Sequence, residues 1–194
     1  MSETKFQKFW NNQYGLLTPV GWNLTRDLAH LRTRFHALPE SKRYPESNQE
    51  RQTIVNRANT LLREIIGDDN SFWLISSRRK PHKSIVDNAA KQRFAIEKFE
   101  LLEEFEWVDL KDDIEDQLPW QTYTRYFDKL GVDFDTLFLK IADEEDWATL
   151  FINAHNGDIL APYDGGFDLI VNDISKILTL EKKYQDWLPT TRFL

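Results

Sequence analysis

The stretch Trp147–Leu188 constrains the fold most, because it predicts two strands joined by a tight turn and followed by a helix. Asn156–Gly157 is the residue pair that most readily takes the positive φ angles of a short hairpin turn. Pro162 cannot donate to a ladder, so its position in the second strand must face a bulge or an edge. Gly165–Gly166 permits a sharp redirection, after which residues 167–171 form either a third strand or a continuation of the second.

The same stretch ends in a predicted helix. Asp173 or Ser175 can cap its first turn, and Pro189 stops it. Apolar residues at helical spacing should face the sheet, and these are Ile177, Leu178, Leu180, Tyr184, Trp187 and Leu188.

The first half of the chain predicts two further helices and a strand. Residues 3–14 carry aromatic residues three and four positions apart, which is typical of a short amphipathic helix. In residues 31–37, Leu, Thr, Phe and Ala alternate with Arg and His, and this alternation predicts a strand. Ser47 and Glu50 form a capping box for a helix over 47–66, whose buried stripe is Ile54, Val55, Ala58, Leu61, Leu62 and Ile65. Its outer face is predicted to present Arg51, Arg57 and Arg63.

The middle of the chain predicts strands at 72–76, 104–110 and 120–127 and a helix that ends at Ala142. The first of these, FWLIS, is expected to be buried on both faces. Residues 86–98 can form a further helix, and residues 111–117 are expected to form an acidic turn. The elements together predict an α+β fold with a mainly antiparallel sheet of about five strands and helices largely on one face. We expect one domain over residues 1–194.

Two blocks of the sequence resemble a family of small bacterial domains of unknown function. One is RFHALPESKRYPESNQERQTIVNRANTLL at Arg34–Leu62, and the other is PYDGGFDLIV followed by YQDWL near the C-terminus. Together they cover roughly a third of the chain and are specific as a pair. The resemblance implies a compact bacterial domain, and it implies no activity or catalytic residues.

Composition excludes several classes of protein. Apolar residues make up 41 % of the chain, which excludes a disordered protein, and no apolar run approaches the roughly 18 residues of a membrane span. The first ten residues have no apolar signal-peptide core, so we expect a cytoplasmic protein. The absence of cysteine removes disulfides, thiolate metal sites and cysteine nucleophiles.

Charge is distributed unevenly along the chain. Residues 1–100 hold 17 Lys/Arg and 11 Asp/Glu, a net charge of +6, whereas residues 101–194 hold 8 and 21, a net charge of −13. The two halves can neutralise each other, with acidic surface left over. That surplus should repel nucleic acid and attract basic proteins.

The densest acidic segment, residues 103–116, is the candidate partner-binding surface. Crowded carboxylates repel one another, so either the basic half of the chain or a cationic partner should offset their repulsion. Phe105, Trp107 and Trp120 would supply apolar anchors within the charged rim. The predicted partner-binding residues are Glu103, Glu104, Glu106, Trp107, Asp109, Asp112, Asp113, Glu115 and Asp116.

A second candidate site is a basic loop. Residues 38–45 are bounded by two prolines and are not expected to form regular structure. The loop and the strand before it could bind a phosphate or another anion. Its cations could instead pair with the acidic half of the chain, and this is the favoured interpretation. The residues concerned are Arg34, His36, Lys42, Arg43 and Tyr44.

Signatures of known enzymes are absent from the sequence. It contains no Walker loop, dinucleotide fingerprint, nucleophile elbow or histidine pair at ligand spacing, so we predict no catalytic residues, cofactor or metal. His155 with Asp158 and Asp164 is the strongest remaining metal alternative. Asp164 and Asp168 could serve as acid and base, although they are more typical of residues that bond turn amides. The short basic run 78–83 is typical of a solvated loop rather than a nucleic-acid site.

The leading functional hypothesis is an interaction protein. We expect an immunity protein that binds and blocks a cationic bacterial toxin domain, such as a nuclease, through residues 103–116. The alternative, from a different class, is an enzyme that acts on a phosphorylated or otherwise anionic small molecule at the basic residues of 34–44. The sequence leaves the oligomeric state open.

Overall fold

The computed structural model describes residues 4–79, 99–105, 120–145 and 148–189. Its strands form one sheet in which every neighbouring pair is antiparallel, in the order β1-β7-β6-β5-β2-β4-β3. The strands are β1 Arg32–His36, β2 Phe72–Arg79, β3 Glu100–Phe105, β4 Trp120–Phe127, β5 Thr149–Asn153, β6 Ile159–Tyr163 and β7 Gly166–Ile170. The expected antiparallel sheet is confirmed, but it has seven strands rather than about five, because β1 and β7 extend the C-terminal hairpin.

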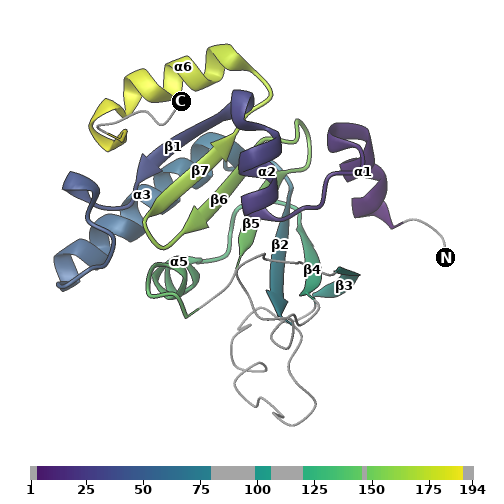
Figure 1. Ribbon diagram of the computed structural model, residues 1–194, viewed down its shortest axis with the longest axis horizontal. Coiled ribbons are helices and arrows are strands. Elements are labelled where there is room, and N and C mark those ends of the chain that lie inside the picture. The colour runs from purple at the N-terminus through teal and green to yellow at the C-terminus, as the bar shows by residue number, and fades with distance from the viewer. Residues whose placement is uncertain (1–3, 80–98, 106–119, 146–147, 190–194) are drawn as a thin grey trace, which may run out of the picture.

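Helices cover both faces of this sheet rather than largely one. In Figure 1, α2 lies in front of β6 and β7, and α3 lies behind them. Helices α3, α5 and α6 pack on one face, and α1 and α2 pack on the other. The helices are α1 Lys5–Tyr14, α2 Gly21–Asp27, α3 Asn48–Ile66, α5 Asp135–Ala142 and α6 Ile174–Lys183, with short 3-10 turns at Ala29–Leu31, Pro39–Ser41 and Gln185–Trp187.

The central strand β2 explains why two helical layers are needed. Phe72 and Leu74 point into the core under α3, whereas Ile75 points into the core under α1. All three side chains are at most 1 % exposed, so the predicted burial on both faces is confirmed. A strand that is apolar on both sides requires a cover on each side.

The C-terminal hairpin forms as predicted and gains a third strand. Gly157 takes a φ of 82° in the turn between β5 and β6, and β7 then pairs with both β6 and β1. Residues 166–170 are therefore a separate strand, which settles the two interpretations that the glycine pair left open.

The longest helix, α3, begins and ends as the sequence predicts. Ser47 and Glu50 form the capping box, and the apolar stripe is buried. Arg57 differs from the prediction, because it is only 8 % exposed. Its guanidinium donates to the carbonyl of His36 at 2.7 Å and lies 4.9 Å from the centre of the Trp187 ring. Arg57 therefore packs beside the end of β1 instead of facing solvent.

Helix α6 is shorter than predicted and ends at Lys183. Asp173 provides its cap by accepting from the N–H of Ser175. Ile177 and Leu180 are buried, but Leu178 is 61 % exposed, because it lies one position away from the face that Ile177 and Leu180 share.

Part of the predicted middle region lies outside the described residues. The expected helix over 86–98, the acidic turn at 111–117 and most of the basic run 78–83 fall there. Among the helices of the described ranges, none combines the length and the hydropathy needed to cross a membrane.

Gly166 is the position where the sheet tolerates no side chain. A Cβ at this residue would overlap the carbonyl oxygen of Phe35 in the paired strand β1. We expect Gly166→Ala to lower the free energy of unfolding by about 3 kcal/mol in urea titrations, because the obstacle is backbone and cannot rotate away. Gly131→Ala is the matched control, since nothing lies within 4 Å of its added Cβ. Equal stability of the two variants would contradict the tight packing of β7 on β1.

Candidate functional site

The predicted acidic surface begins on an outer strand of the sheet. Glu103 and Glu104 belong to β3, which is the last strand of the described sheet. The other residues predicted to bind a partner lie outside the described residues, and these are Glu106, Trp107, Asp109, Asp112, Asp113, Glu115 and Asp116.

Trp120, at the other end of the same connection, is not an exposed anchor. Its side chain is 6 % exposed, and its ring meets the ring of Trp22 edge-on at a centroid distance of 5.0 Å. The prediction of an exposed anchor at Trp120 is therefore wrong, because α2 covers this residue.

The residues of the predicted anion-binding loop are divided between β1 and the segment that follows it. Residues 39–41 form a single 3-10 turn, which is more regular than the sequence suggested, and Glu40 and Ser41 take positive φ angles. Lys42 contacts Glu46 at 2.9 Å and Glu50 at 2.7 Å. Its charge is therefore matched close by.

Arg34 is held against Asp168 of β7, its register partner across the sheet. Nε and Nη2 of Arg34 donate to the two carboxylate oxygens at 2.8 and 2.9 Å, and Arg32 donates to Oδ1 at 3.0 Å. The hydrogen bonds that Arg34 donates to Asp168 raise the pKa of Arg34 above its usual value. The Asp168 side chain is only 6 % exposed, so two arginines neutralise a nearly buried carboxylate.

Arg43 bridges two carboxylates that come from distant parts of the chain. Its guanidinium contacts Asp164, in the turn between β6 and β7, and Glu144, just after α5. Tyr44 donates to the same Glu144 at 2.8 Å. The loop is thereby tied to the sheet and to α5 by polar contacts at the surface.

His36 is the remaining member of the predicted anion site. Its Nε2 lies 3.1 Å from the hydroxyl of Ser41. Burial, together with the nearby charges of Arg34 and Arg57, lowers the pKa of His36 and so disfavours its cationic form. The structure thus brings these five residues into one neighbourhood, but Arg34, Lys42 and Arg43 already contact carboxylates.

A pocket opens beside this neighbourhood where β5 and β6 separate. Their ladder contains only the pairs Phe151 with Leu160 and Ile152 with Ile159. Continuing the register would pair Thr149 with Pro162, which has no N–H to donate. The two strands diverge at this point, and the resulting pocket has a volume of about 530 Å³, within the roughly 300–1,000 Å³ typical of ligand sites.

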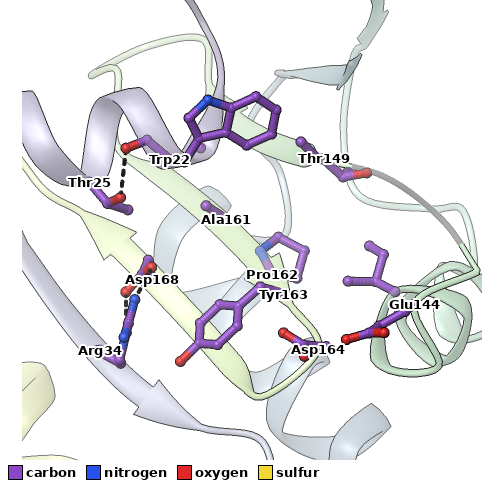
Figure 2. Close-up of a pocket in the computed structure, with 13 residues that line it drawn as sticks. Trp22, Thr25, Arg34, Glu144, Thr149, Ala161, Pro162, Tyr163, Asp164 and Asp168 are labelled. Carbon is purple, nitrogen blue, oxygen red and sulfur yellow. Dashed lines mark hydrogen bonds and ion pairs between the residues drawn. The ribbon is translucent and has the colours of Figure 1, made fainter. Parts of the chain in front are cut away.

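The lining of this pocket comes from several parts of the fold (Figure 2). Helix α2 forms the roof, the ends of β5 and β6 form the walls, β1 and β7 contribute Arg34 and Asp168, and the residues around the end of α5 contribute to the mouth. We call this pocket the strand slot. It is lined by Gly21, Trp22, Thr25, Arg34, Ile141, Glu144, Ala148, Thr149, Ala161, Pro162, Tyr163, Asp164 and Asp168.

Sequence reasoning missed most of the strand slot. Trp22 and Thr149 carry no motif, and only their placement in the fold brings them near Tyr163 of the PYDGGFDLIV block. The signals in the sequence were Pro162, whose missing donor predicted an edge or bulge, and the candidate residues Arg34, Asp164 and Asp168. Asp164 and Asp168 bind arginines and not the turn amides that the sequence favoured.

The residues considered for a metal site are used in other contacts. Asp158 accepts from Lys176 at 2.8 Å and from the N–H of Asn172 at 3.1 Å, and Asp164 holds Arg43. Within the part of the chain that the structure describes, no cluster of three or more His, Asp or Glu side chains could hold a metal ion.

Asp168 should stabilise the fold through its two arginines. We expect Asp168→Asn to lower the free energy of unfolding by about 2 kcal/mol, because it leaves two cations without their carboxylate. The loss is smaller than for a fully buried pair, since the side chains of Arg32 and Arg34 remain 26 % and 34 % exposed. Asp27→Asn, in an exposed pair with Arg26, should leave the free energy of unfolding nearly unchanged. Similar losses in urea titrations of the two variants would argue against this role.

Tyr163 should make the protein less stable in alkali. Burial raises the pKa of this phenol from about 10 to about 12. Between those values the unfolded chain loses the proton while the folded chain keeps it, so the free energy of unfolding falls as the pH rises from 10 to 12. Thermal unfolding at intervals across this range should show a shallower fall for Tyr163→Phe than for the unmodified protein. Parallel curves would exclude a buried phenol at this site.

Comparison with known proteins places the chain in a family without assigning a function. Neither the curated proteins nor the solved structures contain a match. The family model described as a domain of unknown function, DUF3885, matches residues 20–191, which include every strand of the sheet and the whole strand slot. The chain therefore belongs to the DUF3885 family.

Proposed function

We propose that this chain is an interaction protein that binds a basic protein partner through the acidic segment 103–116. In its specific form, the proposal is an immunity protein that neutralises a cationic bacterial toxin domain, such as a nuclease. The segment holds eight acidic residues and Lys111 as its one basic residue.

The observation that carries the proposal is the set of ion pairs that the basic residues of the first half of the chain form. Six cations of this half, all in the described part of the chain, contact carboxylates outside the segment 103–116. The pairs are Arg32 and Arg34 with Asp168, Lys42 with Glu46 and Glu50, Arg43 with Asp164 and Glu144, Arg51 with Asp143, and Arg63 with Asp68. These six cations are therefore not available to offset the repulsion within the segment, whereas a cationic partner would offset it.

The position of the segment also supports the proposal. Its first residues lie in β3, and Leu101 of that strand is 52 % exposed. Phe105 and Trp120 are register partners, so both ends of the connection 106–119 are fixed at the same end of the sheet. An outer strand can add a strand from a partner through backbone hydrogen bonds, while side-chain charge selects which partner binds.

The enzyme alternative is less well supported by the contacts. It requires cations that can hold an anionic substrate, yet Arg34, Lys42 and Arg43 each contact at least one carboxylate. Binding of an anion there would first require those ion pairs to open.

Affinity capture with matched charge variants tests the proposal. We expect the tagged protein to retain a basic protein in stoichiometric amount from bacterial lysate at low salt, and to retain less of it at high salt. Reversal of Glu103, Glu104 and Glu106 to lysine should reduce the recovery at least tenfold. The captured protein should then lose its toxic or nuclease activity when it is mixed with the unmodified chain.

The control reverses three exposed acids outside the segment, Glu40, Asp69 and Asp128. It makes the same change in net charge and should leave capture nearly unchanged. Circular dichroism and thermal unfolding check that both triple variants fold. Equal loss in the two variants would show a response to net charge alone, and recovery of no basic protein would overturn the proposal.

A further inference from the structure

The residues that line the strand slot are of the kinds that bind small molecules. The proposed function does not use this pocket. Much of its lining is apolar and includes Ala161, Pro162 and the faces of Trp22 and Tyr163. Pro162 and Ala161 are buried, and the ring of Tyr163 is half-buried. A flat apolar group could therefore leave water on entering the slot.

The charges of the lining favour a cation. Three lining residues are carboxylates and one is an arginine. The arginine, Arg34, binds Asp168 through two hydrogen bonds, which leaves Asp164 and Glu144 as the other charged groups of the lining. Figure 2 shows these two side chains close together at the mouth, below Pro162.

The protein already places one cation at this mouth. Arg43 reaches over from its loop and contacts Asp164 and Glu144, with 59 % of its side chain exposed. Asp164 itself is only 13 % exposed. Arg43 thus shows that the carboxylate pair accepts a guanidinium, and because most of the arginine side chain is exposed, it can swing away and another cation can take its place.

We propose that the strand slot binds a small organic cation, an amine joined to a flat apolar body, with Asp164 and Glu144 holding the amine and Trp22 and Tyr163 flanking the body. The bound amine replaces Arg43 on the two carboxylates. Neutral and anionic molecules of the same shape bind less well, because they bring no positive charge to replace that of Arg43 on the two carboxylates. This site is separate from segment 103–116, so either proposal can fail alone.

Three probes of nearly equal shape test the charge preference. Calorimetry and amide chemical-shift mapping of the full chain would use 2-phenylethylamine, 2-phenylethanol and phenylacetate. We expect the amine to bind at least tenfold more tightly than the alcohol, phenylacetate to bind least, and the shifts to cluster at the lining residues. Binding of all three with equal affinity, shifts outside the slot, or no binding of the amine at millimolar concentration would each overturn the proposal.

Substitutions at the mouth test which groups hold the amine. Asp164→Asn and Glu144→Gln should each weaken amine binding several-fold, and together at least tenfold, whereas Asp69→Asn, at an exposed carboxylate outside the slot, should have no effect. Ala148→Phe should block binding by filling the slot. Unchanged affinity in the Asp164 and Glu144 double variant would overturn the assignment.

Arg43 gives the most discriminating variant, because its removal should strengthen binding. Arg43→Ala frees the two carboxylates, so the amine should bind several-fold more tightly, while Arg26→Ala, another exposed arginine in an ion pair, should leave affinity unchanged. Thermal unfolding checks that each variant folds. Weaker binding by Arg43→Ala would show that the guanidinium supports the ligand instead of competing with it, and would overturn the displacement model.

Discussion

The missing backbone donor at Pro162 determines the form of the candidate site. In an interior strand, each N–H that faces a neighbour normally completes a ladder bond, and a residue without one ends the ladder. Here β5 and β6 share only two register pairs before they diverge. The sheet remains continuous because those two pairs still join β5 to β6, and because β7 pairs with β6 along its length, including Pro162 with Phe167. A single imino acid can therefore open a slot without dividing the sheet.

Local sequence chemistry predicted those elements whose signals are short-range. The capping box at Ser47, the turn at Gly157 and the alternating strand 120–127 all formed where expected. The sequence indicated strands at 31–37 and, as one of two interpretations, at 167–171, but it did not show that these two segments pair with each other across 130 or more positions. No local pattern reports such a pairing.

The site was harder to predict than the fold for a related reason. Cations and carboxylates were both visible in the sequence, but their partners were not. Arg34 pairs with Asp168, and Arg43 pairs with Asp164, and in each pair the partners lie more than 100 residues apart in the sequence. Arg57 shows the same limitation. Helical periodicity predicts that it faces solvent, whereas its contacts with the ring of Trp187 and the carbonyl of His36 bury it. Side-chain charge alone cannot distinguish a binding residue from one half of an internal pair.

The contact between Trp22 and Trp120 joins the two regions that the proposals concern. Trp22 lines the strand slot, while Trp120 ends the connection that carries the acidic segment. An occupant of the slot that shifts the Trp22 ring would press on the base of that connection. The two regions are thus separate sites that are linked by one contact between two large rings.

The internal pairing of the basic residues also affects how charge is distributed over the molecule. The described cations of β1, the following loop and α3 are matched locally, whereas the acidic segment 103–116 begins on β3, at the opposite end of the strand order from β1. Under the proposed function, the negative charge of that segment would give the molecule a dipole moment. In the field of an approaching cation the molecule would rotate before any contact forms, so more of its collisions would begin with the β3 end facing the other molecule.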